Sequence, residues 1–251
     1  IKAPQGKKLV VVDLSQIEVR TLCWLSKSKS ILEDIKNADD IYEVFAIEFG
    51  LWKKDKGSLK DKKPNVRHTV KTMVLGCGYG VGYKKFASIS GMTEKEAKDA
   101  VDLYREKMHK VVSYWRSLNT ELKDVEGSPY DFNIKLPSGR SLKYGKINSR
   151  TSMVEVAEKN IVLERQEYYA IVVKNSSRRA VKLYGGLLAE NASQALARDV
   201  FCDCMLRIDS IGLNIICHVH DEVVVEVDEE KAEEALKDVI KIMKTPPSWI
   251  P

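Results

Sequence analysis

The fold is decided by one stretch, N-I-I-C-H-V-H-D-E-V-V-V-E-V at residues 214–227. Apolar runs on both sides of an acidic tip predict a β-hairpin with strands at Asn214–Val219 and Val223–Val227. A further buried strand is expected at Lys8–Val12, a β-branched run that ends abruptly at Asp13. Helical patterns occupy most of the chain between these strands. We therefore expect an α+β fold, in which a mostly helical part is inserted into a sheet-bearing part.

Periodicity and capping residues predict where the helices lie. Thr93 and Glu96 match the capping box S/T-x-x-E, so a long helix should begin there. The Lys-rich segment Lys53–Lys63 is expected to be an exposed loop. Tyr130–Tyr144 is expected to be a hairpin, because its period falls towards two and Pro137-Ser-Gly139 is typical of a turn. The expected helices cover approximately residues 16–26, 44–49, 64–79, 93–123, 187–211 and 229–244.

Composition and charge fit a folded protein but select no partner. The 251 residues are 44% hydrophobic and carry a net charge of +5, which suits a polyanionic partner and many other proteins as well. The five cysteines form no C-x-x-C pair, which argues against a zinc ribbon and favours reduced thiols. No apolar run approaches the roughly 20 residues that cross a bilayer. We therefore expect no membrane partner and a soluble, cytoplasmic chain.

Carboxylates follow two of the expected strands. Asp13 ends the first strand, and Asp221 and Glu222 occupy the tip of the hairpin. A lone aspartate in the first position is more often a helix N-cap, and two acids at a tip can be a solvated turn. Together they offer hard oxygen ligands, which Mg²⁺ prefers in sites shared with substrate phosphates.

The segment R-H-T-V-K-T-M-V-L-G-C-G-Y-G at residues 67–80 carries a more specific pattern. Arg67, Lys71, Leu75 and Tyr79 recur every four residues and would form one stripe on a helix. Two cations suit a triphosphate, while the apolar surface and the ring suit a base and sugar. The alternative is a solvated basic turn followed by core packing. Three glycines, at 76, 78 and 80, favour close approach of another group, such as template or nucleotide.

These motifs resemble those of family A DNA polymerases. D-L-S-Q-I-E-V-R at 13–20 is similar to motif A, residues 67–80 are similar to motif B, and H-V-H-D-E-V-V-V-E-V at 218–227 is similar to motif C. The three occur in the family's order. The resemblance implies a polymerase palm, an antiparallel sheet with helices on one face, and an inserted, mostly helical fingers subdomain. Further stretches agree with the family at residues 39–45, 136–144 and 190–199.

The resemblance assigns the chemistry to five residues. It implies that Asp13 and Asp221 bind two Mg²⁺ ions, for which Mn²⁺ can substitute. Glu222 would support this metal site either from outside the set of metal ligands or through a water molecule. Arg67 and Lys71 would bind the incoming triphosphate. Lys71 would also be a candidate proton donor to pyrophosphate.

It also assigns residues that select the nucleotide. Glu18 would be the steric gate that excludes a ribose 2′ hydroxyl, and Tyr79 would pack against it. Tyr42, in a position that is often His in bacterial members, would lie beside the phosphates or sugar. Gln16 would also belong to the dNTP site. Leu75 stands where many members carry Phe or Tyr, which predicts altered discrimination against dideoxynucleotides.

Contacts to DNA are expected from four other residues. Gln194, with Asn191 and His220, would contact the minor groove or the primer end. All base pairs present the same hydrogen-bond acceptors in the minor groove, so these residues could sense the shape of a base pair without reading its sequence. Gly80 would lie near the template. For Gln194, a polar residue on a half-buried helix remains a competing interpretation.

The family pattern divides the chain into palm at 1–29, fingers at 30–128 with the motif B helix at about 65–80, and palm again at 129–251. No thumb or 3′–5′ exonuclease segment precedes motif A in this sequence. We therefore expect a fragment of a larger, phage-type polymerase. The missing segments or a processivity factor would complete its grip on DNA, in a bacterial or phage-infected cell.

The predicted function is template-directed addition of dNTPs to a primer 3′ end on DNA, with pyrophosphate release. One alternative is a single-subunit RNA polymerase, against which Glu18 and the H-D-E of motif C argue. The other is a catalytically silent module that only binds nucleic acid. Retention of Asp13, Asp221, Lys71 and Tyr79 argues against it.

Overall fold

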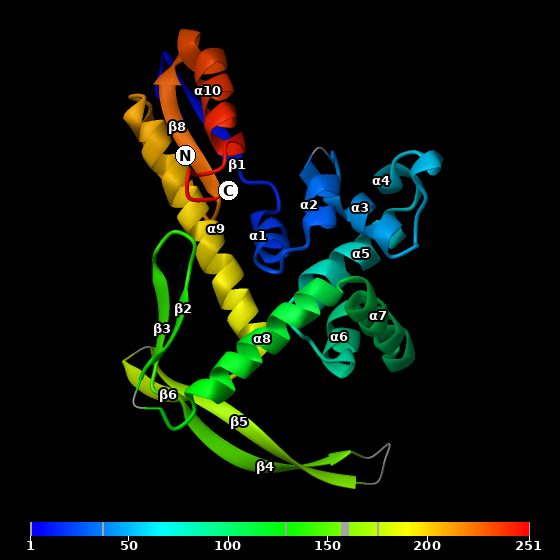
Figure 1. The fold of residues 1–251 in the computed structure, drawn as a ribbon. Coiled ribbons are helices and arrows are strands. Elements are labelled where there is room, and N and C mark those ends of the chain that lie inside the picture. The colour runs from blue at the N-terminus through cyan, green and yellow to red at the C-terminus, as the bar shows by residue number, and fades with distance from the viewer. Residues whose placement is uncertain (1, 37, 129, 157–160, 175, 251) are drawn as a thin grey trace. The chain divides into compact units, whose positions relative to one another are not determined.

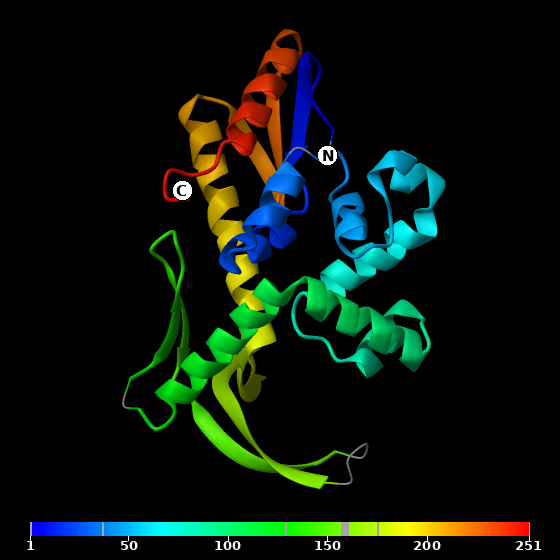
Figure 2. The same ribbon diagram turned by 45° about the vertical axis from the view of Figure 1, so that its right-hand side comes forward.

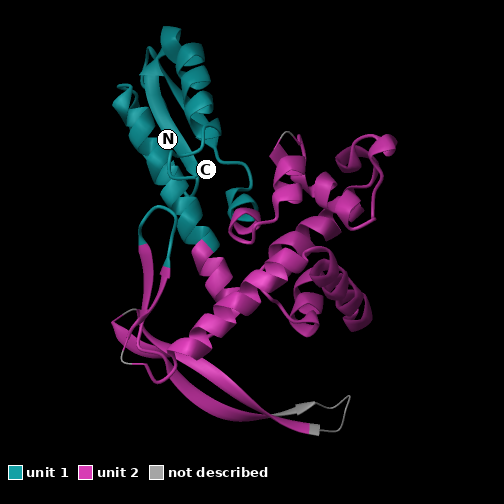
Figure 3. Ribbon diagram, in the orientation of Figure 1, with its two compact units in different colours: residues 1–21, 135–140, 193–251 teal, residues 22–134, 141–192 magenta. Residues whose placement is uncertain are grey.

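The computed structural model describes residues 2–36, 38–128, 130–156, 161–174 and 176–250. Contacts divide the chain into two compact units, coloured separately in Figure 3. Unit 1 comprises residues 1–21, 135–140 and 193–251, and unit 2 comprises residues 22–134 and 141–192. Each unit is thus assembled from segments that are distant in the sequence. The mixture of helices with antiparallel sheets confirms the α+β prediction, whereas the palm and fingers boundaries stay predictions.

Unit 1 is built on a three-stranded antiparallel sheet in the order β1-β8-β7 (Figure 1). The strands are β1 (Lys7–Asp13), β7 (Asn214–Val219) and β8 (Glu222–Asp228), so the predicted strand and hairpin are confirmed. All three strands belong to one sheet because β1 pairs with β8 along its whole length.

Two helices cover one face of this sheet. The pairing places Val10 opposite Val225 on a face that clusters with Phe201 of α9 (Gly185–Ser210) and Val239 of α10 (Ala232–Lys244). Val11, which points to the other face, is 49% exposed. Burial of apolar side chains is the main favourable term in such a core. The expected palm-like layout, a sheet with helices on one face, is therefore present.

The tip of a second hairpin also belongs to unit 1. Strands β2 (Phe132–Lys135) and β3 (Ser141–Gly145) pair as predicted, and the Gly139 N–H donates to the Leu136 carbonyl in the turn. Asp199 of α9 fixes this tip. Its carboxylate accepts from the Ser138 hydroxyl at 2.6 Å and from Arg140 Nε at 2.9 Å.

Unit 2 contains most of the helices, which Figures 1 and 2 show from two sides. Helix α1 begins in unit 1 and continues into unit 2. The helices that follow it, up to the β2–β3 hairpin, lie in unit 2. In chain order, α1 (Ile17–Leu25) is followed by α2 (Lys29–Lys36), α3 (Ile41–Glu48), the 3₁₀ turn Lys54–Lys56, α4 (Leu59–Lys62), α5 (Pro64–Cys77), α6 (Tyr83–Ser90), α7 (Glu94–Lys107) and α8 (His109–Val125).

The prediction of an exposed loop at Lys53–Lys63 is wrong in part. The segment holds the 3₁₀ turn and α4, which begins after Ser58, whose hydroxyl accepts from the Asp61 N–H at 3.4 Å. Leu59 is fully buried, and its N–H donates to the Glu43 carboxylate at 2.7 Å. One apolar residue among many lysines was enough to anchor the segment, because its burial and a capping hydroxyl outweigh the local charge.

The single long helix expected at 93–123 is two helices. The capping box at Thr93 and Glu96 is present in both directions, so the predicted start is confirmed. The chain breaks at Met108, whose φ and ψ of −95° and 39° are not helical, and α8 begins at His109. Met108 is buried, so tertiary packing rather than a local Gly or Pro signal sets the break.

A second three-stranded antiparallel sheet was not predicted. It comprises β4 (Asn148–Val156), β5 (Ile161–Lys174) and β6 (Ser177–Leu183), with β5 in the centre. The signal lay in β5, where the run I-V-L-E-R-Q-E-Y-Y-A-I-V-V-K is rich in β-branched and aromatic residues.

All five cysteines are free, as expected, and Cys23, Cys77 and Cys204 are buried. Burial raises the pKa of the Cys77 thiol to about 12, so this thiol stays protonated at neutral pH. Within the described residues, no helix is both long enough and apolar enough to span a bilayer.

Candidate active site

In unit 1, the pairing of β1 with β8 brings the predicted acidic residues together. Asp13 is the last residue of β1 and lies opposite Glu222, the first residue of β8. The Leu14 N–H donates to the Asp221 carbonyl at 3.1 Å, which continues the connection past the strand ends. Asp13, Asp221 and Glu222 therefore meet at one end of the sheet, although more than two hundred residues separate Asp13 from the other two.

Strained backbone flanks these carboxylates on both sides. His220 precedes Asp221 with φ of 54°, and Gln16 lies three residues after Asp13 with φ of 48°. Left-handed conformations are uncommon for residues other than glycine, and they cluster at functional sites. The side chain of Gln16 is exposed, and its Oε1 accepts from the Ser15 hydroxyl at 2.5 Å. His220 is exposed at the turn between β7 and β8.

The two aspartates are electrostatically coupled. Partial loss of water raises the pKa of the Asp13 carboxyl, and the negative charge of Asp221 raises it further. Like charges that share one locale disfavour ionisation, and a bound cation removes that penalty. The described residues contain no group of three or more His, Cys, Asp or Glu that could hold a metal ion. Two carboxylates fill few of the coordination positions of a hard cation, which suits Mg²⁺, an ion that usually keeps several water or substrate oxygens.

In unit 2, helix α5 presents the predicted cations. Pro64 starts the helix at a position where its missing N–H costs nothing, and Arg67 and Lys71 follow one turn apart. Both cations lie over the ring of Tyr42 in α3, with Arg67 Cζ 5.2 Å and Lys71 Nζ 5.9 Å from its centroid. Arg67, Lys71 and Tyr42 are thus brought together, as the sequence interpretation required.

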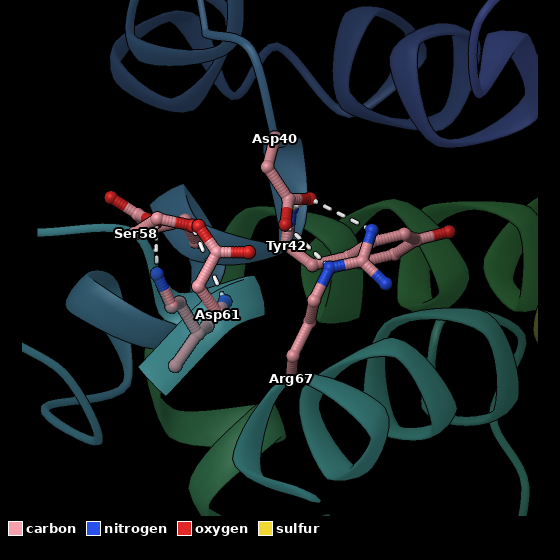
Figure 4. A network of polar contacts seen from close by, with 7 residues as sticks. Asp40, Tyr42, Ser58, Asp61 and Arg67 are labelled. Atoms are coloured by element: carbon pink, nitrogen blue, oxygen red, sulfur yellow. Dashed lines mark hydrogen bonds and ion pairs between the residues drawn. The ribbon is translucent and has the colours of Figure 1, made fainter. Parts of the chain in front are cut away.

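Asp40 is a residue that the sequence analysis missed, and Figure 4 shows its position. Its carboxylate accepts from Arg67 Nε at 2.5 Å and from Arg67 NH2 at 3.2 Å. It also caps α3, because Oδ1 accepts from the Tyr42 N–H at 3.1 Å. These hydrogen bonds raise the pKa of the Arg67 guanidinium, so Arg67 stays protonated and positively charged. The signal was the Asp-Asp pair just before the apolar pattern of α3, since Asp is a preferred N-cap.

The two roles of Asp40 can be separated by stability measurements. We expect Asp40→Ala to lower the free energy of unfolding by about 1 kcal/mol for the lost cap, and by up to about 1 kcal/mol more for the partly exposed ion pair. Asp40→Asn keeps the capping oxygen and should lose only the second part. Urea denaturation of both variants gives the comparison. Equal losses in the two variants would contradict the capping role.

The rest of the motif B stripe is only partly open to solvent. Leu75 is 42% exposed, whereas Tyr79 is half-buried beyond the end of α5. The glycine prediction needs correction for two positions. An added Cβ would lie 3.2 Å from Phe86 at Gly76 and 2.9 Å from the Val74 carbonyl at Gly78. The group that approaches these glycines is therefore the protein itself.

The remaining candidates lie on α1 and α9. Glu18 is exposed in the first turn of α1, and Gln194 is exposed on α9, both in unit 1. Asn191, in unit 2, is half-buried, and its Nδ2 donates to the Tyr144 hydroxyl at 2.9 Å. This bond holds Asn191 against the β3 strand, which leaves its carbonyl oxygen for other partners.

Comparison with known proteins turns this arrangement into a family assignment. The model of DNA polymerase family A matches residues 1–249. This chain belongs to DNA polymerase family A. The curated relatives include the DNA polymerase of Bacillus phage SP02, which is 29% identical over 98% of this chain and 39% of its own length. DNA polymerase I of Pseudomonas aeruginosa is 26% identical over 96% of this chain and 23% of its own length.

The fold of this family A chain is also similar to a solved structure. The POL domain of Pol1 from M. smegmatis, in complex with DNA primer-template and dNTP, has a TM-score of 0.67 and 21% identity. The likeness covers 97% of this chain and 39% of that one. At this identity it supports the fold. The chain thus spans well under half the length of the relatives described here.

Family A DNA polymerases use divalent metal ions, and the residues of this chain fit such an ion. The donor set is two carboxylates from different strands, and each carries hard oxygen ligands. The coupling that raises the pKa of Asp13 is the penalty that a cation would relieve. Asp13 and Asp221 are therefore the candidate ligands within unit 1.

Proposed function

We propose that this chain is the catalytic core of a template-directed DNA polymerase, which adds dNTPs to a primer 3′ end and releases pyrophosphate. The observation that carries the proposal is the β1–β8 register, which joins Asp13 of motif A to the Asp221–Glu222 tip of motif C. Membership of family A supports the reaction class. In this assignment unit 1 contains the palm chemistry, and the helices of unit 2 contain the fingers.

Different residues of the chain are proposed to bind the metal ions and the triphosphate. Asp13 and Asp221 would hold two Mg²⁺ ions, or Mn²⁺ in their place, and Glu222 would orient them through water. When bound, these ions supply Lewis acidity and neutralise charge on the primer oxygen and the triphosphate. Arg67 offers a planar guanidinium that is suited to phosphate oxygens, and Lys71 offers a mobile ammonium.

The reaction joins the primer 3′ oxygen to the α-phosphorus of the dNTP and breaks the bond from that phosphorus to the leaving pyrophosphate. The 3′ hydroxyl gives up its proton to a solvent water molecule as the new bond forms. Lys71 Nζ is proposed to give a proton to the pyrophosphate oxygen as the bond breaks. Transfer of this kind needs little covalent participation by the protein, so catalysis rests on positioning and charge.

Substrate selection is proposed for residues outside the carboxylate pair. Glu18 would exclude ribose by occupying the space of the 2′ hydroxyl, with Gln16, Tyr42, Leu75 and Tyr79 contributing to the dNTP site. The proposed DNA contacts are Gln194, Asn191, His220 and Gly80. Primer-template DNA and dNTPs are the proposed partners, with a thumb, an exonuclease or a processivity factor from further segments or chains. The proposed location is the cytoplasm of a bacterial or phage-infected cell.

Primer extension tests this proposal directly. The chain is incubated with a primed DNA template and Mg²⁺, with dNTPs in one series and ribonucleotides in another. Extension with dNTPs alone supports the assignment. Extension with ribonucleotides at the same rate would indicate an RNA polymerase-like enzyme, and binding without extension would indicate a silent module.

Leu75 provides a prediction about nucleotide discrimination. The side chain is exposed on α5 and offers no aromatic face, so Leu75→Phe should change the ratio of dideoxynucleotide to deoxynucleotide incorporation severalfold. Single-nucleotide addition with the two substrates in competition measures this ratio. An unchanged ratio together with an unchanged addition rate would contradict the role of Leu75 beside the sugar.

A further inference from the structure

The guanidinium of Arg67 is held along one edge by the carboxylate that starts α3. Arg67 Nε donates to Asp40 Oδ2 at 2.5 Å, and NH2 donates to Oδ1 at 3.2 Å (Figure 4). Oδ1 also accepts from the Tyr42 N–H at 3.1 Å, so the carboxylate is itself anchored to the first turn of the helix. The side chains of Arg67 and Asp40 are 28% and 18% exposed, so the pair is partly shielded from water.

The ring of Tyr42 supports the same guanidinium on its face. Arg67 Cζ lies 5.2 Å from the ring centroid, and Tyr42 is buried, which leaves the ring few other positions. A cation over an aromatic ring is attracted to it, and a two-point contact with a carboxylate restricts the direction in which the guanidinium points. Two residues at the start of α3 therefore restrict Arg67 from two sides.

The other edge of the Arg67 guanidinium remains for a ligand. A guanidinium has five N–H donors, and Asp40 occupies the edge formed by Nε and NH2. Within the part of the chain that the structure describes, the Arg67 side chain forms no other hydrogen bond or ion pair. The edge that includes NH1 can bind phosphate oxygens with two parallel hydrogen bonds.

The Asp40 carboxylate could act on a bound triphosphate in two opposite ways. Its negative charge repels phosphate, but water and salt screen this repulsion because the pair is partly exposed. Its hydrogen bonds order Arg67 in advance, and ordering a long side chain is a cost that binding must otherwise meet. Lys71 adds a positive charge one turn further along α5, and it forms no ion pair with any described residue. The repulsion is therefore offset, and the ordering of Arg67 should dominate.

We propose that Asp40 is a positioning residue for the incoming dNTP, which holds Arg67 so that its free edge meets the triphosphate. The proposal rests on the proposed polymerase function, in which Arg67 binds this triphosphate. It goes beyond the capping of α3, because one carboxylate then links the start of that helix to nucleotide affinity. Its consequence has an unusual sign. Removal of a negative charge beside an anion site should weaken the binding of the anion.

The test measures dNTP affinity and addition rate separately. Isothermal titration of the chain with dATP and Mg²⁺, without DNA, gives the affinity independently of chemistry. Rapid-quench addition of one nucleotide to a primed template, over a range of dATP concentrations, gives the apparent affinity and the rate at saturation. The variants are Asp40→Ala, Asp40→Asn, Arg67→Ala and the double variant Asp40→Ala with Arg67→Ala. Thermal unfolding checks that each variant is folded.

Two neighbouring carboxylates provide matched controls. Asp39 is exposed beside Asp40 and forms no described hydrogen bond or ion pair with Arg67, so Asp39→Asn controls for the loss of one negative charge. Glu43 joins α3 to α4, since its carboxylate accepts from the Leu59 N–H at 2.7 Å. Glu43→Gln therefore controls for a weakened contact of α3 that does not involve Arg67.

We expect Asp40→Ala and Asp40→Asn each to weaken dATP binding by about threefold to tenfold, the cost of ordering one long side chain. The rate at saturating dATP should be unchanged, because the contact contributes to binding before the chemical step. In the Arg67→Ala background, Asp40→Ala should have no further effect, since Asp40 acts through Arg67. Asp39→Asn and Glu43→Gln should bind dATP as the unmodified chain does.

Tighter dATP binding by Asp40→Asn would overturn the proposal, because the carboxylate would then act mainly as a repelling charge. Equal losses from Asp40→Ala in the presence and absence of Arg67 would also overturn it, since they would reflect the packing of α3. A chain that binds no dATP in the titration would contradict it as well.

The outcome is separable from the proposed catalytic function. If Asp40→Ala binds dATP as tightly as the unmodified chain and primers are still extended, the positioning proposal fails and the polymerase proposal stands. If dATP binding depends jointly on Asp40 and Arg67 but the unmodified chain extends no primer, the catalytic proposal fails alone.

Discussion

Replacing Asp221 with Asn should lower the rate of primer extension by about a thousandfold or more. The substitution keeps the size and shape of the side chain, but it removes the charge and one of the two oxygens that a divalent cation needs. Stabilisation of developing charge by a bound ion is worth several kcal/mol, and each 1.4 kcal/mol corresponds to a factor of about ten. Single-turnover extension at saturating dNTP measures the effect. Asp13→Asn should behave in the same way, because the two carboxylates are coupled.

The same strand provides a matched control. Asp228 ends β8 at the side opposite to Glu222, where it pairs with Lys7 and Lys231 near the surface. Asp228→Asn removes one negative charge from the same sheet but breaks only exposed ion pairs, so the rate of extension should change little. If Asp228→Asn and Asp221→Asn slowed extension equally, the effect would reflect the stability of the sheet, and the carboxylate site would be refuted.

The elements that the sequence predicted are those with strong local patterns. The β7–β8 hairpin follows from apolar runs around a polar tip, and α7 begins where its capping box stands. The break at Met108 could not be predicted, because no Gly or Pro marks it and packing of buried side chains determines it. The position of Leu59 was missed for the same reason, since its N–H donates to Glu43 of α3, sixteen residues earlier in the chain.

The candidate site was predictable in its residue types but not in its assembly. Asp13 and Asp221 stood out as acids at strand ends, yet only the observed register of β1 against β8 shows that they meet. The pairing of Asp40 with Arg67 could not be predicted from the sequence, because it joins the start of α3 to one face of α5. Side-chain pairs between elements depend on tertiary geometry, and a single sequence contains no direct signal for them.

Lys71→Ala should slow the chemical step by about a hundredfold to ten-thousandfold, the range typical of losing a general acid. Lys71 is exposed one turn after Arg67 on α5, so truncation leaves no buried cavity and should not unfold the chain. Lys84→Ala, an exposed lysine on α6, controls for the loss of one positive charge from unit 2. Rapid-quench measurement of single-nucleotide addition gives the rate and the apparent dNTP affinity separately.

Lys71→Arg decides whether this lysine supplies a proton or only a charge. Arginine keeps the positive charge and binds phosphate well, but it holds its proton too tightly to donate it readily. We therefore expect Lys71→Arg to keep most of the dNTP affinity and to regain little of the rate. A solvent deuterium isotope effect on addition should be present in the unmodified chain and reduced in both variants. Full recovery of the rate in Lys71→Arg would refute the proton-donor role, because charge alone would then account for everything that Lys71 contributes.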